Sequence, residues 1–133
     1  MANEDTRSIL AMYGLNGSVD LGFLVGKALL QIKAGQSQLI LCFDHDTEIC
    51  VESSFSVNTN GAETEVAVAN NNYMNSIGPL YLFFGREIAS VGNNGDGSLS
   101  LVFAGDTAII KLLDSNTDYE SYQISCGDLL IVV

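Results

Sequence analysis

The stretch Leu39–Glu52, LILCFDHDTEICVE, decides the fold that we expect for this chain. Apolar residues alternate on both sides of an acidic turn, Asp44-His45-Asp46, which is the pattern of a β-hairpin with one buried face. The alternation places these side chains on the buried face: Leu39, Leu41, Phe43, Ile49 and Val51. The other face of the second strand carries Glu48, Cys50 and Glu52. We therefore expect a sheet that is packed on one side and acidic on the other.

A near-copy of this hairpin follows sixty residues later, at Leu99–Leu112, LSLVFAGDTAIIKL. Six of the eleven residues from Leu39 to Ile49 are identical in the later stretch. An apolar run that ends in glycine precedes each copy, LGFLVG at 21–26 and LYLFFG at 80–85. We predict a single domain, 1–133, with an internal repeat of residues 21–57 and 80–125.

The rest of the chain fits a mainly β domain, because thirteen glycines and one proline indicate many turns. We expect a strand at Lys27–Lys33, an edge strand at Glu63–Ala69 and a buried strand at Leu129–Val133. Ser53–Val57 is expected to continue the second strand of the first hairpin. The predicted architecture is two repeated three-stranded meanders packed as a sandwich, a roll or a partly open barrel. One to three short helices are expected near residues 6–13, 20–25 and 78–84.

The two hairpins differ on the face that points away from the core. Aligned without a gap, the second hairpin carries there Ser100, Val102, Ala104, Ala108, Ile110 and Leu112. A strand pair that is apolar on both faces lies under another layer or meets a partner chain. A homodimer through the apolar second hairpin is therefore one alternative.

The net charge is −11, from sixteen acidic and five basic residues. Such a charge argues against binding to nucleic acid, whose phosphates repel it, and against an anionic membrane surface. No basic residue lies between Lys33 and Arg86, although six acidic residues do. The negative field of these acidic residues can steer a basic protein partner toward the chain. The alternative explanation for the acidic residues is that they keep the protein in solution.

The sequence offers no set of residues for catalysis or metal binding. His45 is the only histidine and lies in a turn, where a nucleophilic system would lack a buried, oriented base. A calcium loop starting at Asp44 would need glycine and glutamate where Ile49 and Phe55 stand. We therefore predict no catalytic residue, no cofactor and no metal site. Asp46 and Thr47, repeated as Asp106 and Thr107, are expected to serve the turns through hydrogen bonds from side chain to backbone.

The three cysteines, Cys42, Cys50 and Cys126, are expected to be reduced and to act as small hydrophobic residues. A disulfide between Cys42 and Cys50 across the hairpin is the alternative. The N-terminus lacks the basic and apolar regions of a secretory signal, and no apolar run reaches the length of a transmembrane helix. The expected location is the cytoplasm.

Three features of the sequence resemble a family of small bacterial domains of unknown function. They are the pairs Gly26-Lys27 and Gly85-Arg86, the L-x-L-x-F hairpin with its Asp-Thr turn, and YESYQI at 119–124. Family members carry a similar glycine-arginine strand start, an F-x-D-G-T hairpin and a late Y-E-S/A-W-x-I strand. Tyr122 stands here where the family has tryptophan. The resemblance implies a β-rich fold and assigns no catalytic residue.

Charge and resemblance together lead to one functional hypothesis. The chain is expected to be a non-enzymatic acidic protein that engages a basic protein partner. By analogy of class, it would serve as an immunity or accessory protein beside a bacterial toxin. The predicted contact residues are Asp44, His45, Asp46, Glu48 and Glu52. The alternatives are a homo-oligomeric structural module and a small ligand-binding or enzymatic β-barrel.

Overall fold

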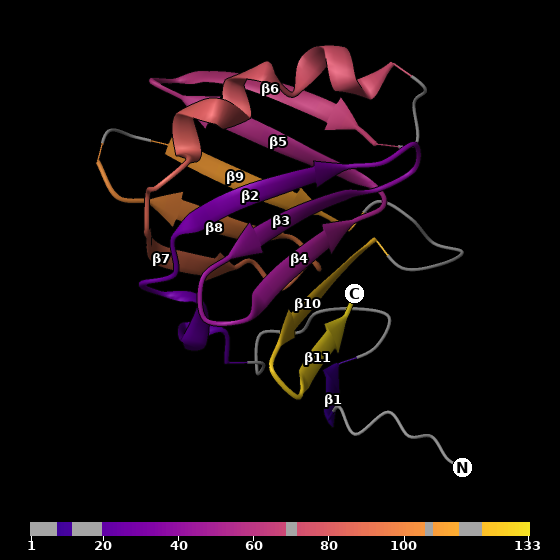
Figure 1. Ribbon diagram of the computed structural model, residues 1–133, viewed down its shortest axis with the longest axis vertical. Coiled ribbons are helices and arrows are strands. Elements are labelled where there is room, and N and C mark those ends of the chain that lie inside the picture. Colours follow the sequence, from indigo (N-terminus) through magenta and orange to yellow (C-terminus); the bar gives the residue numbers. More distant parts are fainter. Residues whose placement is uncertain (1–7, 12–19, 69–71, 106–107, 115–120) are drawn as a thin grey trace.

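The computed structural model describes residues 8–11, 20–68, 72–105, 108–114 and 121–133, and these form two open β-sheets packed face to face (Figure 1). The first sheet has the order β1 (Ser8–Ala11), β11 (Leu129–Val132), β10 (Tyr122–Cys126), β4 (Thr47–Val51), β3 (Leu39–Phe43), β2 (Leu29–Ala34). The second has the order β6 (Ala62–Ala67), β5 (Ser54–Thr59), β9 (Ala108–Leu113), β8 (Leu99–Phe103), β7 (Ile88–Asn93). The predicted mainly β sandwich is confirmed, with the meanders β2-β3-β4 and β7-β8-β9.

The core lies between the sheets and includes the face predicted for the first hairpin. Leu39 pairs with Val51 and Leu41 pairs with Ile49, and all four side chains are buried. Phe103 of β8 stacks on Phe43 of β3 with ring centroids 6.4 Å apart, so the two hairpins share one core. Alternation along the strands therefore gave the correct buried face for β3 and β4.

The two halves exchange their fourth strands. After β4 the chain leaves the first sheet, and β5 pairs with β9 in the second sheet. After β9 the chain returns, and β10 pairs with β4 in the first sheet. The prediction that Ser53–Val57 continues β4 is wrong, because Glu52 and Ser53 both donate backbone hydrogen bonds to the carbonyl of Ser121, at 3.0 and 3.1 Å. These bonds hold the chain at the point where it crosses to the other sheet.

A short antiparallel ribbon joins the halves at equivalent positions. Ala28 pairs with Glu87, its counterpart 59 residues later. On either side, Gly26 N donates to the Ile88 carbonyl and Gly85 N donates to the Leu29 carbonyl, both at 2.8 Å. The two halves are thus related by a local twofold arrangement at this ribbon. The internal duplication as an origin, and its boundaries, stay predictions.

The face assignment of β9 is wrong by one residue. Phe43 pairs with Thr47 across three intervening residues, whereas Phe103 pairs with Ala108 across four. The extra residue reverses the alternation, because successive side chains of a strand point to opposite faces. Ala108, Ile110 and Leu112, predicted to face outward, are buried in the core. The outward face carries Ile109, Lys111 and Leu113 instead, so a charged residue interrupts it.

The N-terminal helix predicted near 6–13 is also wrong within the described residues. Residues 8–11 form β1, which pairs in parallel with β11, and the remainder of the predicted helix lies outside the described residues. The free edge of β11 offers unpaired backbone groups, and pairing there satisfies both strands. The strands predicted at Lys27–Lys33, Glu63–Ala69 and Leu129–Val133 are confirmed as β2, β6 and β11, except that Ala69 lies outside the described residues.

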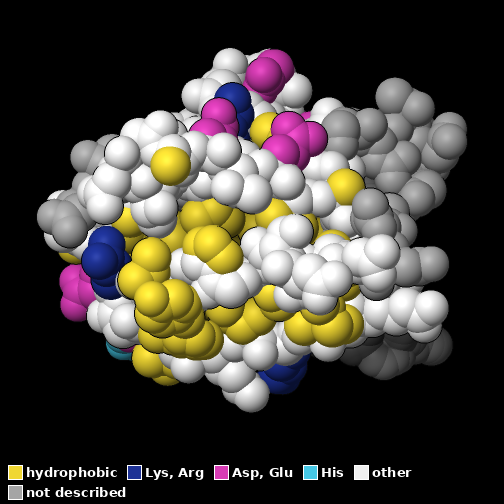
Figure 2. Space-filling view, turned by 90° about the horizontal axis from the view of Figure 1, so that it is seen from above, with side chains coloured by type: hydrophobic (Ala, Val, Ile, Leu, Met, Phe, Trp, Pro, Cys, Tyr) yellow, Lys and Arg dark blue, Asp and Glu magenta, His cyan; other side chains and the backbone are white. Residues whose placement is uncertain are grey.

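Three short 3-10 helices complete the described structure: η1 (Gly22–Leu24), η2 (Tyr73–Ser76) and η3 (Gly78–Phe83). Helices near 20–25 and 78–84 were predicted, and η2 was not. η2 contacts β6, and the residues after η3 bond to β2. The η2–η3 segment therefore spans from the edge of one sheet to the edge of the other, on the side seen in Figure 2.

The exchanged strand β10 gives a test of this fold. Ile124 is fully buried between Ile49 of β4 and Ile131 of β11. We expect Ile124→Ala to lower the free energy of unfolding by about 2–5 kcal/mol, measured by urea denaturation. Ser125→Ala, on the opposite face of β10, should change it by about 0.5 kcal/mol or less. Equal effects of the two substitutions would contradict the placement of β10.

Candidate functional site

The acidic turn between β3 and β4 has an unusual backbone. His45 and Asp46 have φ angles of 56° and 59°, and Gly105, at the place of His45 in the second copy, has 103°. This left-handed region favours glycine and tolerates aspartate and histidine better than bulky residues. Thr47 Oγ1 lies 3.1 Å from the carbonyl oxygen of His45 and donates to it. The predicted role of Thr47 in the turn is confirmed, whereas Asp106 and Thr107 lie outside the described residues.

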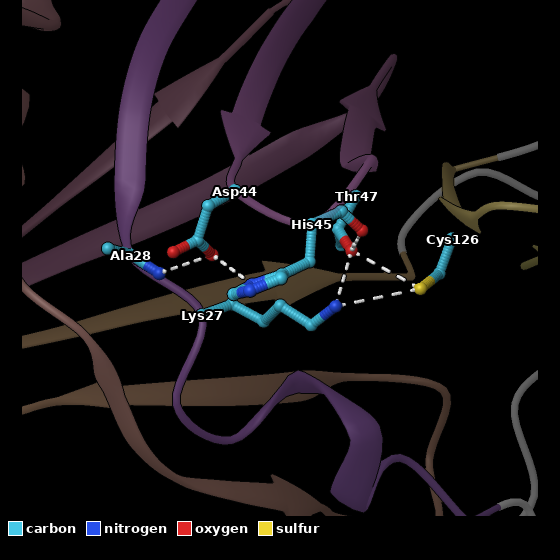
Figure 3. Close-up of polar contacts among 6 residues, drawn as sticks. All are labelled: Lys27, Ala28, Asp44, His45, Thr47 and Cys126. Atoms are coloured by element: carbon cyan, nitrogen blue, oxygen red, sulfur yellow. Dashed lines mark hydrogen bonds and ion pairs between the residues drawn. The ribbon is translucent and has the colours of Figure 1, made fainter.

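Asp44 is held by hydrogen bonds within the protein, although its side chain is 32% exposed. Its Oδ1 accepts a hydrogen bond from Ala28 N at 3.0 Å, and its own N donates to the Ala28 carbonyl at 3.1 Å (Figure 3). His45 Nδ1 lies 3.2 Å from the same carboxylate oxygen. The bond from Ala28 lowers the pKa of the carboxyl, and His45 and Lys27 add to this effect. Asp44 thus fastens the turn to the residue at the centre of the ribbon that joins the halves.

Lys27 extends beneath the turn toward Cys126 (Figure 3). Its Nζ donates to Thr47 Oγ1 at 2.9 Å and lies 3.7 Å from Cys126 Sγ. Thr47 Oγ1 is 3.3 Å from the same sulfur, and Thr47 and Cys126 are paired across β4 and β10. Sequence reasoning missed this cluster because its members lie up to 99 residues apart. The one available signal was the Gly26-Lys27 pair of the repeat.

The outward face of the first sheet holds Glu48 between a base and a thiol. Its Oε2 lies 3.9 Å from Lys33 Nζ and 3.9 Å from Cys42 Sγ. Cys42 pairs with Glu48 and Cys50 pairs with Ile40, so the two cysteines are not opposite each other. All three cysteines are free thiols, and the disulfide alternative is not formed. Burial, together with the nearby negative charges of Glu52 and Glu48, raises the pKa of Cys50 to about 11.

The five predicted contact residues do not form one cluster. Asp44, His45 and Asp46 are adjacent in the turn, and Glu48 follows one residue into β4. Glu52 lies beyond the other end of β4, where Gln123 Nε2 donates to its Oε1 at 3.4 Å. At roughly 3.3 Å per strand residue, about 20 Å separate Asp46 from Glu52. The structure therefore brings the first four together and sets Glu52 apart.

Two further features of the described residues bear on the chemistry of the site, the grouping of metal-ligating side chains and a surface groove. Within them, no three histidine, cysteine or carboxylate side chains gather as a metal site. An open groove of about 420 Å³ lies between β6 and η2, and Glu65 is the one carboxylate among its lining residues. The hydroxyl of Tyr73, on the groove wall, donates to the carbonyls of Gly35 and Gln38. No helix in the described part of the chain is long and apolar enough to cross a membrane.

Comparison with known proteins gives one match. A family model covers residues 22–133 and is described as a family of unknown function (DUF6188). No curated protein and no solved structure matches the chain significantly. The matched residues include all three sequence features that resemble a family of unknown function, from Gly26-Lys27 to YESYQI at 119–124.

The bond between Asp44 and Ala28 predicts a pH-dependent stability. A carboxyl whose pKa is lowered in the folded state from about 3.8 adds stability above that value, and this stability is lost as the pH falls through the folded pKa. Asp44→Asn should therefore be less stable than the wild type at neutral pH, and the difference should shrink in acid. Urea midpoints measured between about pH 7 and about pH 2.5 would show this. A difference that stays constant over this range would contradict a contribution from the carboxylate charge.

The raised pKa of Cys50 predicts a slow thiol. Relative to a cysteine with a pKa of 9.0, a pKa of about 11 lowers the thiolate population at about pH 8 roughly a hundredfold, and the stronger nucleophile recovers part of this. We expect Cys50, as the one thiol left in a Cys42→Ser/Cys126→Ser variant, to react about tenfold slower with iodoacetamide than a cysteine peptide. Adding Glu52→Gln should speed the reaction. An unchanged rate would show that Glu52 does not act on the thiol.

Proposed function

The chain belongs to DUF6188, a family of unknown function, and we propose that it is a non-enzymatic binding protein that engages a basic protein partner. The observation that carries this proposal is the acidic turn surface, which we define as His45, Asp46 and Glu48. His45 and Glu48 have side chains that are 74% and 48% exposed, and Asp46 is exposed as well. These groups stand on a hairpin whose turn is bonded to Ala28 through Asp44.

Charge supports a basic partner. The chain carries −11 overall, and the exposed carboxylates of Asp46 and Glu48 add to this negative field at the turn. Complementary charge raises the rate of association and fixes the orientation of the partner. In its sharpest form, the partner is a bacterial toxin that the protein neutralises as a cytoplasmic immunity or accessory protein. This form rests on the analogy of class drawn from the sequence.

The interior of the sandwich favours binding over catalysis. One continuous apolar cluster, with members from both sheets, fills the space between them in the described residues. A ligand-binding barrel would instead enclose a pocket with a few converging polar groups. The groove beside β6 is open and has one carboxylate among its lining residues. These features support a protein-binding role ahead of the enzymatic alternative.

The proposal predicts a salt-dependent association that the acidic turn surface controls. The probe is the protein encoded by the neighbouring gene, with its binding rate measured by stopped-flow fluorescence. We expect Asp46→Lys/Glu48→Lys to slow association by about tenfold or more at low salt, because local steering is reversed. The matched control is Glu63→Lys/Glu65→Lys, which makes the same charge change on the exposed strand β6 of the other sheet.

Three results would contradict the proposal. They are no binding of the probe, binding that does not respond to salt, and equal slowing by the two double variants. Equal slowing would mean that the net charge, and not the turn, steers the partner. All variants are checked by circular dichroism, because the lysine that replaces Asp46 must adopt a φ angle of 59°, in the left-handed region.

A further inference from the structure

Exposed hydrophobic side chains gather on one side of the sandwich. Six large ones are exposed among the described residues, and four of these belong to η3, the residue after it, and β2. The four are Leu30 (60%), Tyr81 (68%), Leu82 (39%) and Phe84 (46%). The backbone bond from Gly85 N to the Leu29 carbonyl, at 2.8 Å, holds the end of η3 beside β2. Figure 2 shows hydrophobic side chains spread over this face.

The backbone turns Leu30 outward. The register between β2 and β3 shifts between Leu29 and Gln31, so Leu30 is the extra residue of a bulge. Its counterpart in the second half is Ala89, at the same shift between Ile88 and Ser90. The bulge is shared by both halves, whereas the large apolar side chain occurs in only one. Contiguous exposed apolar surface of this kind is typical of an interaction site.

Opposite charges border the apolar strip. On one margin, β6 presents the exposed Glu63 and Glu65. On the other margin, β2 presents Lys33, whose side chain is 53% exposed. Lys33 Nζ forms an ion pair with Glu48 Oε2 at 3.9 Å. In Figure 2, acidic side chains lie along one border of the face with a basic side chain among them, and a basic side chain also lies at the opposite border. Both margins are edge strands of their sheets.

We propose that this face, the strip of Leu30, Tyr81, Leu82 and Phe84 with its margins β6 and β2, is an isologous interface between two copies of this chain. A twofold axis parallel to the strip lays the apolar residues of one copy on those of the other. The same rotation sets the acidic margin of each copy against Lys33 of its partner. The charges of this one surface are then self-complementary, as a twofold dimer requires. This face takes the place of the second hairpin as the dimer surface.

The apolar strip carries the affinity, since the net charge of −11 on each copy opposes association. The Debye length of about 8 Å at physiological salt screens most of this repulsion. A standard interface buries about 800 Å² on each partner, a modest share of the 6694 Å² of this chain's surface. Aromatic residues such as Tyr81 and Phe84 are the side chains that most often dominate such contacts.

Sedimentation velocity tests the proposal on the purified chain at about 1 to 200 μM, across the range where a standard-sized interface forms. We expect the mass to rise toward twice the 14.2 kDa of one chain. Phe84→Asp and Tyr81→Ser should each keep it monomeric. Val25→Asp is the matched control, because Val25 is the counterpart of Phe84 59 residues earlier and is similarly exposed, at 48% against 46%.

A charge exchange tests the predicted pairing. Lys33→Glu and Glu65→Lys should each weaken the dimer about tenfold, and the double variant should recover most of the loss. A chain that stays monomeric at the highest concentration would overturn the proposal. So would an equal loss with Val25→Asp, or a dimer broken by Ile109→Asp on the second hairpin and not by Phe84→Asp. Circular dichroism confirms that each variant is folded, and the milder Tyr81→Ser keeps the test valid if Phe84→Asp unfolds.

Discussion

The rest of this fold depends on the antiparallel ribbon at Ala28 and Glu87. Its bonds require the chain to turn sharply just before each first strand, and Gly26 and Gly85 meet this need with φ angles of 91° and 80°. A residue with a Cβ would be strained at either position, since L residues rarely adopt such angles. The ribbon sets the start of β2 and β7 together, and through Ala28 it also fixes Asp44. The sheets, the acidic turn and the apolar strip beside η3 all take their positions from this small element.

Local patterns predicted what depends on local geometry. Alternation gave the buried face of β3 and β4, and the apolar runs ending in glycine gave η1 and η3. The same method failed for β9, because an alignment without a gap hides one additional turn residue. Ile49 matches Ile109 in the gapless alignment of the two hairpins. In the structure, however, the residue that faces the core in the place of Ile49 is Ile110. Sequence identity between repeats therefore does not by itself establish structural equivalence.

Long-range features could not be read from the chain. The crossing after β4 depends on the carbonyl of Ser121, nearly seventy residues away, and β1 depends on an edge formed by β11 at the other end of the chain. The candidate site shows the same limit. The turn itself was expected, but the partners of its side chains, Ala28 for Asp44 and Cys126 for Thr47, come from other strands. Composition predicted an acidic surface, and only the structure separated the bound carboxylate from the exposed ones.

The exchange of the fourth strands has a consequence for how the protein comes into being. Each meander pairs with a strand from the other half of the chain, β4 with β10 and β9 with β5. Neither half therefore has a complete sheet without the other. During synthesis, β4 (Thr47–Val51) emerges from the ribosome well before β10 (Tyr122–Cys126), and its edge stays open until β10 has been made. Pairings of such large sequence separation fold slowly. The edge of β4 is therefore without its neighbouring strand while residues 52–121 are being synthesised.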